Sequence, residues 1–249
     1  MIPKNHPRYA SLKQRALLVE GYKAGATSLE GLIAFGRGES FDYLLGEKTH
    51  KTAISAIDAS AALLLIAKKP VVSVNGNTAV LCPEELIKLA ETTDAKLEIN
   101  LFYRTIERAR VIERLLKEKG AKKVYGVKPD ARLKGLESER GKVDKHGIYS
   151  ADVVFVSLED GDRTKALVES GKKVIAVDLN PLSRTAKTAT ITIVDNIVRA
   201  MPLLIKAVER LSSLDGLDLK KIQASFDNGK NLEDSLLEMV EGIKKTDFR

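Results

Sequence analysis

A short apolar run that stops abruptly at polar residues constrains the fold more than any other feature of this 249-residue sequence. Residues 174–177 are all apolar, with Gly171 just before them and Asp178 directly after them. A run that is apolar at every position indicates a strand buried on both faces, as in a parallel sheet. Ligands of open parallel α/β sheets bind beyond the carboxyl ends of the strands. The polar residues after this run are therefore predicted to form one wall of a binding site: Asp178, Asn180, Ser183, Arg184 and Thr185.

Further strands are predicted along the chain, and most of them also end in polar residues. They lie at residues 71–74, 96–100, 152–158 and 190–194, with a weaker strand at 124–127. The polar strand ends begin at Asn75, Asn100, Glu159, Asp178 and Asp195. Because helices are predicted between these strands, the alternation indicates a parallel sheet with helices on both faces. We predict a Rossmann-like, mostly parallel α/β fold with its binding site along one edge of the sheet.

Helical segments are predicted before and after this α/β core. We expect an N-terminal helical segment at 1–67, the core at 70–212 and a helical tail at 213–249, all within a single domain. With 44% hydrophobic residues, the chain can bury a core of that size. The tail should contain two helices, at about 216–226 and 232–244, whose apolar faces must be covered. They either pack on the core or pair with a second chain.

The second helix of the N-terminal segment carries an unusual glycine pair. A first helix is predicted at 11–24 and a third at 49–67, and the capping box Thr-Ser-Leu-Glu at 27–30 begins the second. The sequence Gly-Arg-Gly-Glu at 36–39 is predicted to interrupt it. Two glycines around Arg37 would let the backbone approach a ligand while the guanidinium binds an oxyanion. An ordinary helix end is the alternative, and the residues alone favour it.

Two other strand ends offer binding groups, each with a structural alternative. Residues 75–77, Asn-Gly-Asn, could hydrogen-bond hydroxyls or carboxylates, or they could form a plain turn. Residues 159–163, Glu-Asp-Gly-Asp-Arg, could hold Mg²⁺ indirectly through water. Equally, Asp162 could cap a helix at 163–169.

Helix starts are predicted after the last two strands. Pro181 is placed to begin a helix beyond the strand end at Asp178. Asp195 and Asn196 begin a helix that runs to Leu211, and its first N–H groups form a natural anion site.

The charge balance favours a small anionic ligand. Lys and Arg number 41 against 34 acidic residues, a formal net charge of +7, which favours anionic partners. Aromatic residues make up only 5% and Trp is absent, so a platform for stacking nucleic-acid bases is poorly supplied. Residues 128–147 show no helix or strand period and form either a lid or binding loop or a disordered insertion. The basic residues of this segment are Arg132, Lys134, Arg140, Lys142, Lys145 and His146.

Several classes of site and location are excluded or disfavoured. Cys82 is the only cysteine, so the chain has no intrachain disulfide and no multi-thiolate metal site. We expect a cytoplasmic protein, because no signal peptide and no apolar stretch of bilayer-spanning length is present. The sequence lacks Walker A, H-E-x-x-H and G-x-S-x-G motifs. The residues alone therefore indicate an α/β protein that binds an anionic, nucleotide-like ligand, without contact to nucleic acid or membrane.

Seven longer segments resemble one family, the archaeal phosphopantothenate synthetases, also described as 4-phosphopantoate–β-alanine ligases. The resemblance covers residues 2 to about 210, and the helical tail resembles the family more loosely. The segments are IPKNHPRY at 2–9, GLIAFGRGESFDYLLGEKT at 31–49, VVSVNGN at 71–77, LEINLFYRT at 97–105, LEDGDRT at 158–164, DLNPLSRTA at 178–186 and ITIVDNIVRA at 191–200.

This resemblance implies an ATP-dependent amide ligase of coenzyme A biosynthesis that works as a homodimer. It would join 4-phosphopantoate to β-alanine with Mg²⁺, through an acyl-adenylate, and release AMP and pyrophosphate. Arg37 and Arg184 would stabilise the phosphates during catalysis, which reverses the preference for an ordinary helix end at 36–39. The implied ATP contacts are Arg15, Arg37, Asp178, Leu179, Asn180, Arg184, Thr185, Asn196 and Ile197.

The residues that bind the other two substrates are hypotheses. For 4-phosphopantoate they are Asn75, Gly76, Asn77, Asn100 and Arg104; for a metal or the β-alanine ammonium group they are Glu159, Asp160 and Asp162, with Arg163 beside them. Rival functions are a non-catalytic nucleotide-sensing module, a ligase for a different acid and amine, and a basic RNA-binding protein. The RNA-binding alternative would need a continuous basic stripe and steeply salt-dependent binding.

Overall fold

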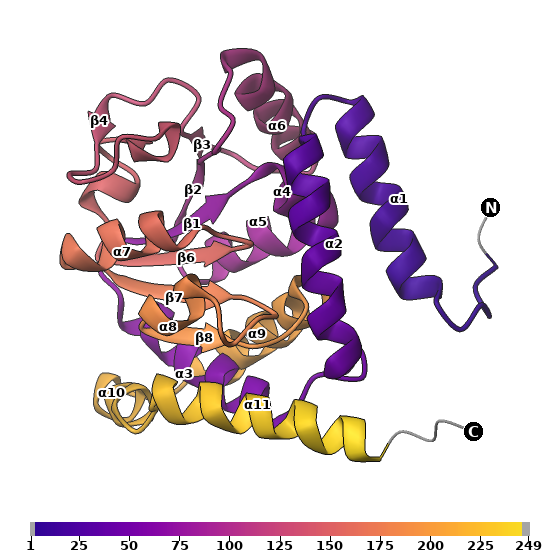
Figure 1. Ribbon diagram of the computed structural model, residues 1–249. Helices are drawn as coiled ribbons and strands as arrows, with labels where there is room; N and C mark the ends of the chain where they lie inside the picture. The colour runs from indigo at the N-terminus through magenta and orange to yellow at the C-terminus, as the bar shows by residue number, and fades with distance from the viewer. Residues whose placement is uncertain (1–2, 246–249) are drawn as a thin grey trace.

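Six parallel strands form the centre of the molecule, as the apolar runs predict (Figure 1). This computed structural model describes residues 3–245, so residues 1–2 and 246–249, which include the first residue of the segment at 2–9 and the end of the predicted tail, lie outside it. The strand order in the sheet is β3-β2-β1-β6-β7-β8. The strands are β1 (Pro70–Val74), β2 (Lys96–Ile99), β3 (Val124–Tyr125), β6 (Val153–Ser157), β7 (Lys173–Val177) and β8 (Ile191–Ile193).

The order of the strands reverses at the middle of the sheet. From β1 the chain adds β2 and β3 on one side, then crosses back to add β6, β7 and β8 on the other side. The carboxyl ends of β1 and β6 therefore face a crevice in which the connecting segments diverge, and this is where such sheets bind ligands. The fold places the strand ends at Asn75 and Glu159 beside this switch point.

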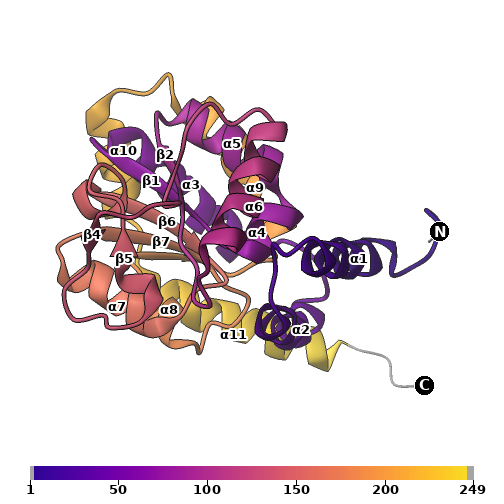
Figure 2. The same ribbon diagram turned by 90° about the horizontal axis from the view of Figure 1, so that it is seen from above.

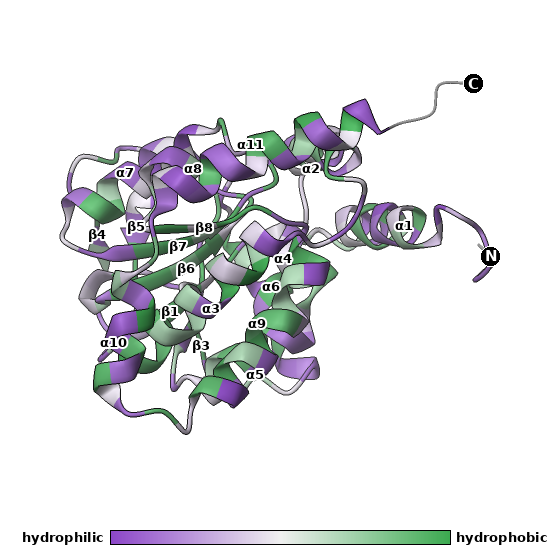
Figure 3. Ribbon diagram, turned by 90° about the horizontal axis from the view of Figure 1, so that it is seen from below, coloured by the Kyte–Doolittle hydropathy of each residue, from purple (hydrophilic) through white to green (hydrophobic). Residues whose placement is uncertain are grey.

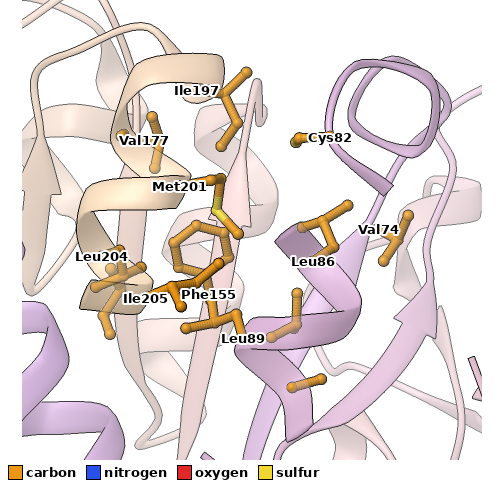
Figure 4. Packing of buried hydrophobic residues seen from close by; sticks show 14 of the residues in the cluster. Val74, Cys82, Leu86, Leu89, Phe155, Val177, Ile197, Met201, Leu204 and Ile205 are labelled. Carbon is orange, nitrogen blue, oxygen red and sulfur yellow. The ribbon is translucent and has the colours of Figure 1, made fainter. Parts of the chain in front are cut away.

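Helices cover both faces of the sheet, as predicted. One face carries α3 (Lys51–Ile66), α5 (Pro83–Thr92), α6 (Ile106–Glu118) and α9 (Ile197–Leu211). Phe155 of β6 is fully buried there, and Figure 4 shows its ring among Met201, Ile205 and Leu89. The opposite face carries α7 (Gly161–Glu169) and α8 (Arg184–Thr188). Figure 3 shows hydrophobic strands at the centre and hydrophilic stretches on these two helices.

The basic segment at 128–147 is neither structureless nor a disordered insertion. It contains the antiparallel pair β4 (Ala131–Arg132) and β5 (Lys142–Val143) and a 3₁₀ turn at Glu139–Gly141. Leu133, Leu136 and Val143 are buried against the sheet face that also carries α7. The prediction failed because these buried side chains follow no regular period, so the order of the segment comes from tertiary packing.

The N-terminal helices α1 (Tyr9–Lys23) and α2 (Leu29–Leu44) stand at one side of the α/β body (Figure 2). The predicted capping box is displaced, because Ser28 rather than Thr27 caps α2 and accepts the N–H of Gly31. Thr27 instead donates its hydroxyl to the Leu18 carbonyl. The predicted interruption at 36–39 is wrong, since α2 continues through both glycines. Buried side chains on either side of them, such as Phe35, hold that helix together.

Two other predicted helix starts are corrected by the caps that the structure shows, and one helix is added. Asp160, not Asp162, caps α7 by accepting the Arg163 N–H. Ser183, not Pro181, precedes the first residue of α8, because its hydroxyl accepts the Ala186 N–H. A helix that was not predicted, α4 (Gly76–Leu81), directly follows β1. In each case a side-chain cap decides the boundary, as is usual at helix N-termini.

The tail helices α10 (Gly216–Ala224) and α11 (Asn228–Lys244) pack on the core, as one of the two alternatives for their apolar faces predicts, while Val240 and Ile243 of α11 stay exposed. α11 begins earlier than predicted because Asp227 caps it. Asn228 and Asn231 then donate their side-chain amides to backbone carbonyls around β8, including that of Thr192. Among residues 3–245 no helix combines the length and apolarity needed to cross a bilayer.

We expect Phe155→Ala to lower the free energy of unfolding by about 3–5 kcal/mol, because it leaves a cavity at the centre of the sheet. Denaturant unfolding followed by circular dichroism measures this change. The matched control is Leu217→Ala on α10, where the side chain is 69% exposed and the expected change is within about 0.5 kcal/mol. Equal losses in both variants would contradict this account of the core.

Candidate active site

A cavity of about 490 Å³ opens at the crevice beyond β1 and β6. Its walls come from α2, the turn after β1, the segment after β2, the basic segment and the turns before α7 and α8. The structure brings together these sequence-predicted residues around it: Arg37, Asn75, Gly76, Asn77, Glu159, Asp160, Arg184 and Thr185.

Asn75 joins the two central strands at the switch point. Its side-chain oxygen accepts the Thr78 N–H at 3.0 Å and so caps α4, and its Nδ2 donates to the Ser157 carbonyl at 2.7 Å. Asn77 donates to the Gly31 carbonyl at 2.8 Å and ties α2 to α4. The residues after β1 therefore form neither a plain turn nor a set of free amides. They fix the geometry of the cavity wall.

A buried ion triad forms the floor of the cavity. The Glu159 side chain is 2% exposed and lies between two arginines. Arg140 donates from Nη1 to Glu159 Oε2 at 3.0 Å, and Arg163 donates to the same oxygen. Burial opposes ionisation of Glu159, but the two guanidinium groups hold the pKa of this carboxyl below its usual range. Both positive charges of the floor are thus partly neutralised by one carboxylate.

The turn between β6 and α7 is tight and strained. Leu158, which lines the cavity, has a φ of 49°, a left-handed conformation that costs a residue with a Cβ on the order of 1–3 kcal/mol. A Cβ added at Gly161 would lie 2.4 Å from Arg184 Cβ, so only glycine lets α8 approach this turn. Thr185 completes the contact by donating its hydroxyl to the Glu159 carbonyl at 3.0 Å.

The strand end at 178–180 lies beside the glycine pair of α2. A Cβ at Gly38 would lie 3.7 Å from Leu179 Cδ1, and the charge of Arg37 acts on Asp178. Burial raises the pKa of Asp178, while hydrogen bonds from Ser183 and from the Asn180 N–H oppose that rise. Arg184 pairs with Asp162 at the rim, where both side chains are largely exposed.

Other predicted site residues lie away from the cavity. Arg15 forms an ion pair with Glu39 at 3.0 Å that links α1 to α2. Arg104 donates to the carbonyls of Gly126 and Val127. Asn100 is fully buried beneath the basic segment and donates to the Arg140 carbonyl at 3.1 Å.

The start of α9 is occupied by a network within the protein. Asn196 is buried and donates to Asp42 at 2.9 Å and to Gln14 at 3.1 Å. Arg199 binds both Asp42 and Asp195. Ile197, the other predicted ATP contact here, is also buried. This end of the sheet therefore anchors α1 and α2 to the α/β body.

Two cavity arginines were not predicted as site residues. Arg108 lies in the first turn of α6, where its sequence context is that of an ordinary amphipathic helix. Arg140 belongs to the basic segment and was noted there only as one charge among several. The signal that could have found Arg108 is its position just beyond the strand end at Asn100 and the helix cap at Thr105.

The carboxylates around the cavity do not form a metal cage. Glu159 is held by two arginines, Asp162 pairs with Arg184, and Asp160 caps α7. Within the described residues 3–245, no group of three or more His, Cys, Asp or Glu side chains is arranged to hold a metal ion.

Glu98 positions the segment that carries Arg140. It is fully buried on β2 and accepts the N–H groups of Asp144 at 2.9 Å and Ile148 at 2.6 Å. A Cβ added at Gly147 would lie 1.8 Å from Glu98 Oε2, so the close approach requires glycine there. Burial raises the pKa of Glu98 to about 7, although the two backbone hydrogen bonds oppose that shift.

The fold and the cavity define a doubly wound α/β protein whose switch-point site, lined by four arginines, suits a phosphorylated small molecule. Sequence comparison makes the class specific. The family model described as phosphopantothenate/pantothenate synthetase matches residues 52–242, and the chain belongs to this family.

Curated relatives match nearly the whole chain. The 4-phosphopantoate–beta-alanine ligase of Thermococcus kodakarensis is 55% identical over 245 residues, which are 98% of this chain and 94% of the relative. The protein of the same name from Thermococcus onnurineus is 54% identical with the same coverage. That from Methanosarcina mazei is 49% identical over 243 residues, covering 98% and 96% of the two chains.

The raised pKa of Glu98 predicts that the stability of the protein depends on pH. Because its pKa in the folded protein, about 7, lies above the usual 4.5, its protonated form favours folding. That contribution is full below pH 4.5 and is lost as the pH rises through 7. The unfolding free energy of the wild type minus that of Glu98→Gln should therefore fall by up to about 3 kcal/mol across this range. Urea unfolding at pH 4.5 to 8 measures it, and a pH-independent difference would refute the assignment.

Proposed function

We propose that this protein is an ATP-dependent ligase that joins 4-phosphopantoate to β-alanine and forms 4′-phosphopantothenate for coenzyme A biosynthesis. The observation that carries the proposal is the 49–55% identity to curated 4-phosphopantoate–beta-alanine ligases across 98% of the chain. The cavity supports it, because four arginines converge where a nucleotide and a phosphorylated acid would bring several negative charges.

In this proposal the β7 side of the cavity binds ATP. Arg37 and Arg184 approach the cavity from α2 and α8 and would hold the triphosphate. Asp178 and Asn180 lie beside Arg37 at the end of β7 and would contact the nucleoside. Arg15, Asn196 and Ile197 would act indirectly, because their contacts fix α1 and α2 to the body.

The chemistry proceeds in two steps. The carboxylate of 4-phosphopantoate attacks the α-phosphorus of ATP, which forms an acyl-adenylate and releases pyrophosphate. The amine of β-alanine then attacks the acyl carbon, forms the amide, loses a proton and displaces AMP. Both steps concentrate negative charge on phosphate oxygens, so positioned guanidinium groups can accelerate them without a covalent enzyme nucleophile.

Asp160 is the proposed partner of the β-alanine amine. One of its oxygens accepts the Arg163 N–H, whereas Oδ2 lies 3.5 Å from Arg140 Nε and accepts no hydrogen bond from the described residues. Burial and the neighbouring Glu159 raise the pKa of Asp160. A carboxylate with a raised pKa beside the cavity can attract an ammonium group and accept its proton.

Mg²⁺ enters the proposal as the complex of ATP rather than as a protein-held ion. The carboxylates near the cavity are already paired with arginines or used as a cap, so they supply no cage for the metal. Phosphate oxygens and water suit Mg²⁺ as ligands. The ion would supply charge neutralisation on the triphosphate.

We also propose that the chain acts as one ligase domain and assembles as a homodimer through α1 and α2. These two helices stand beside the α/β body, and Ile33 and Leu29 of α2 are 70% and 55% exposed (Figure 2). Exposed apolar residues that are grouped on neighbouring helices are typical of an interface. The others on this side are Leu17, Val19, Tyr22, Tyr43 and Leu44.

Product analysis tests the proposed reaction. The protein is incubated with ATP, Mg²⁺, 4-phosphopantoate and β-alanine, each substrate is omitted in turn, and phosphorus NMR follows the products. We expect AMP and pyrophosphate only in the complete mixture. If ADP and phosphate appear instead, the intermediate would be an acyl phosphate rather than an acyl-adenylate. ATP binding without any turnover would instead support a nucleotide sensor.

Arg37→Ala should lower kcat at least about 100-fold with little change in unfolding free energy, because Arg37 is exposed and faces the cavity. Steady-state kinetics and denaturant unfolding measure the two effects. Arg114→Ala, an exposed arginine of α6 that does not line the cavity, is the matched control and should retain full activity. Unchanged turnover in Arg37→Ala would remove this residue from the mechanism.

A further inference from the structure

The cavity has a second basic end that the ATP side does not use. Arg108 and Arg140 approach from the β2 side: Arg108 belongs to the helix that follows β2, and Arg140 binds the Asn100 carbonyl at the end of β2. Arg37 and Arg184 approach from the β7 side. The two pairs therefore enter the cavity from different connecting segments around the switch point between β1 and β6.

Arg108 is held in place by the backbone. Nε donates to the Ala26 carbonyl at 2.9 Å and Nη1 to the Tyr103 carbonyl at 2.8 Å. Nη2 makes no hydrogen bond to any described residue. A Cβ added at Gly76 would lie 2.6 Å from this nitrogen, so Nη2 lies directly against the glycine at the switch point. One donor edge of a fixed guanidinium thus remains open beside the cavity.

Arg140 contributes a second positive charge at the wall of the cavity. Its side chain is 7% exposed and lines the cavity, yet Nε has no hydrogen-bond partner in the described part of the chain. Its nearest carboxylate oxygen there, Asp160 Oδ2, is 3.5 Å away. Because this nitrogen is buried, Arg140 offers a ligand in the cavity its positive charge rather than this donor.

The two guanidinium groups repel each other. Burial lowers the pKa of Arg108, and the positive charge of Arg140 lowers it further, whereas Glu30 partly offsets both. Glu30 is exposed, and among the described residues Arg140 is paired with Glu159, which it shares with Arg163, and with Asp160 at 3.5 Å. An anion bound beside Arg108 would therefore reduce this repulsion.

We infer that Arg108, with Arg140 beside it, binds the phosphate group of the acid substrate and makes the enzyme select the 4-phosphorylated acid over the unphosphorylated one. This inference rests on the proposed function, because it assigns one end of the same cavity. An acid held by its phosphate at the β2 end directs its carboxylate towards the β7 end, where ATP would lie. The family description includes both phosphopantothenate and pantothenate synthetases, so selection for the phosphate needs a physical basis.

The experiment compares the two acids in one set of variants. For wild type, Arg108→Ala and Arg108→Lys, kcat/KM is measured with 4-phosphopantoate and with pantoate, and ATP binding is measured by calorimetry without acid. In Arg108→Ala the ratio of the two kcat/KM values should fall about 10- to 100-fold, the range expected for a charge-assisted hydrogen bond. Affinity for ATP should stay unchanged. Arg108→Lys keeps the charge but loses the fork, so its ratio should be intermediate.

Arg110→Ala is the matched control, since this exposed arginine lies on the same helix but does not line the cavity. It should leave the ratio unchanged. Equal losses for both acids in Arg108→Ala would mean that the residue only supports the structure and would overturn the inference. Weakened ATP binding would overturn it as well, because Arg108 would then serve the nucleotide. A wild type that ligates neither acid would instead refute the proposed function itself.

Discussion

The ion triad of Arg140, Glu159 and Arg163 is the interaction on which the site depends. Arg163 is fully buried and also donates to Ser73 of β1 at 3.1 Å, while Arg140 donates to the Asn100 carbonyl at the end of β2. One carboxylate after β6 therefore connects the carboxyl ends of three adjacent strands. Removing Glu159 would leave two buried guanidinium groups without this shared carboxylate, which is strongly destabilising. The triad thus explains how a cavity built from separate connecting segments keeps a fixed floor.

Placement of Arg140 needs a second set of buried groups. The segment that carries it is held by Glu98, which accepts N–H groups 46 and 50 residues further along the chain, and by Asn100, which donates to the Arg140 carbonyl. Both residues belong to β2 or its end, so the strand order itself brings the basic segment over the site. The buried polar groups of this region serve mainly to position one another, and the groups left for a ligand are the arginines.

The sequence alone was sufficient to predict the parallel sheet and the polar residues at the carboxyl ends of its strands, because each buried strand is a local apolar run. It was less reliable for helix starts: Ser28, Asp160 and Ser183 act as caps where neighbouring residues were predicted, since several adjacent residues have capping side chains. It could not identify Arg108, whose role depends on contacts with Ala26, 82 residues earlier. The resemblance to a family assigned Arg37 to the site, although the helix around it is continuous and its glycines alone suggested an ordinary helix end.

The position of the glycines follows from the same geometry. Gly76 leaves space for the Arg108 guanidinium, Gly161 lets Arg184 approach the turn after β6, and Gly147 admits the Glu98 carboxylate. In each case the missing side chain allows a charged group to come close to the backbone near the edge of the sheet. Under the proposed function, the phosphate of the acid and the triphosphate of ATP repel each other, and arginines that enter the cavity from different connecting segments would let both be present at once. The arrangement of those segments around the switch point would then decide where the reacting carboxylate meets the nucleotide, so the doubly wound sheet itself would set the geometry of the reaction.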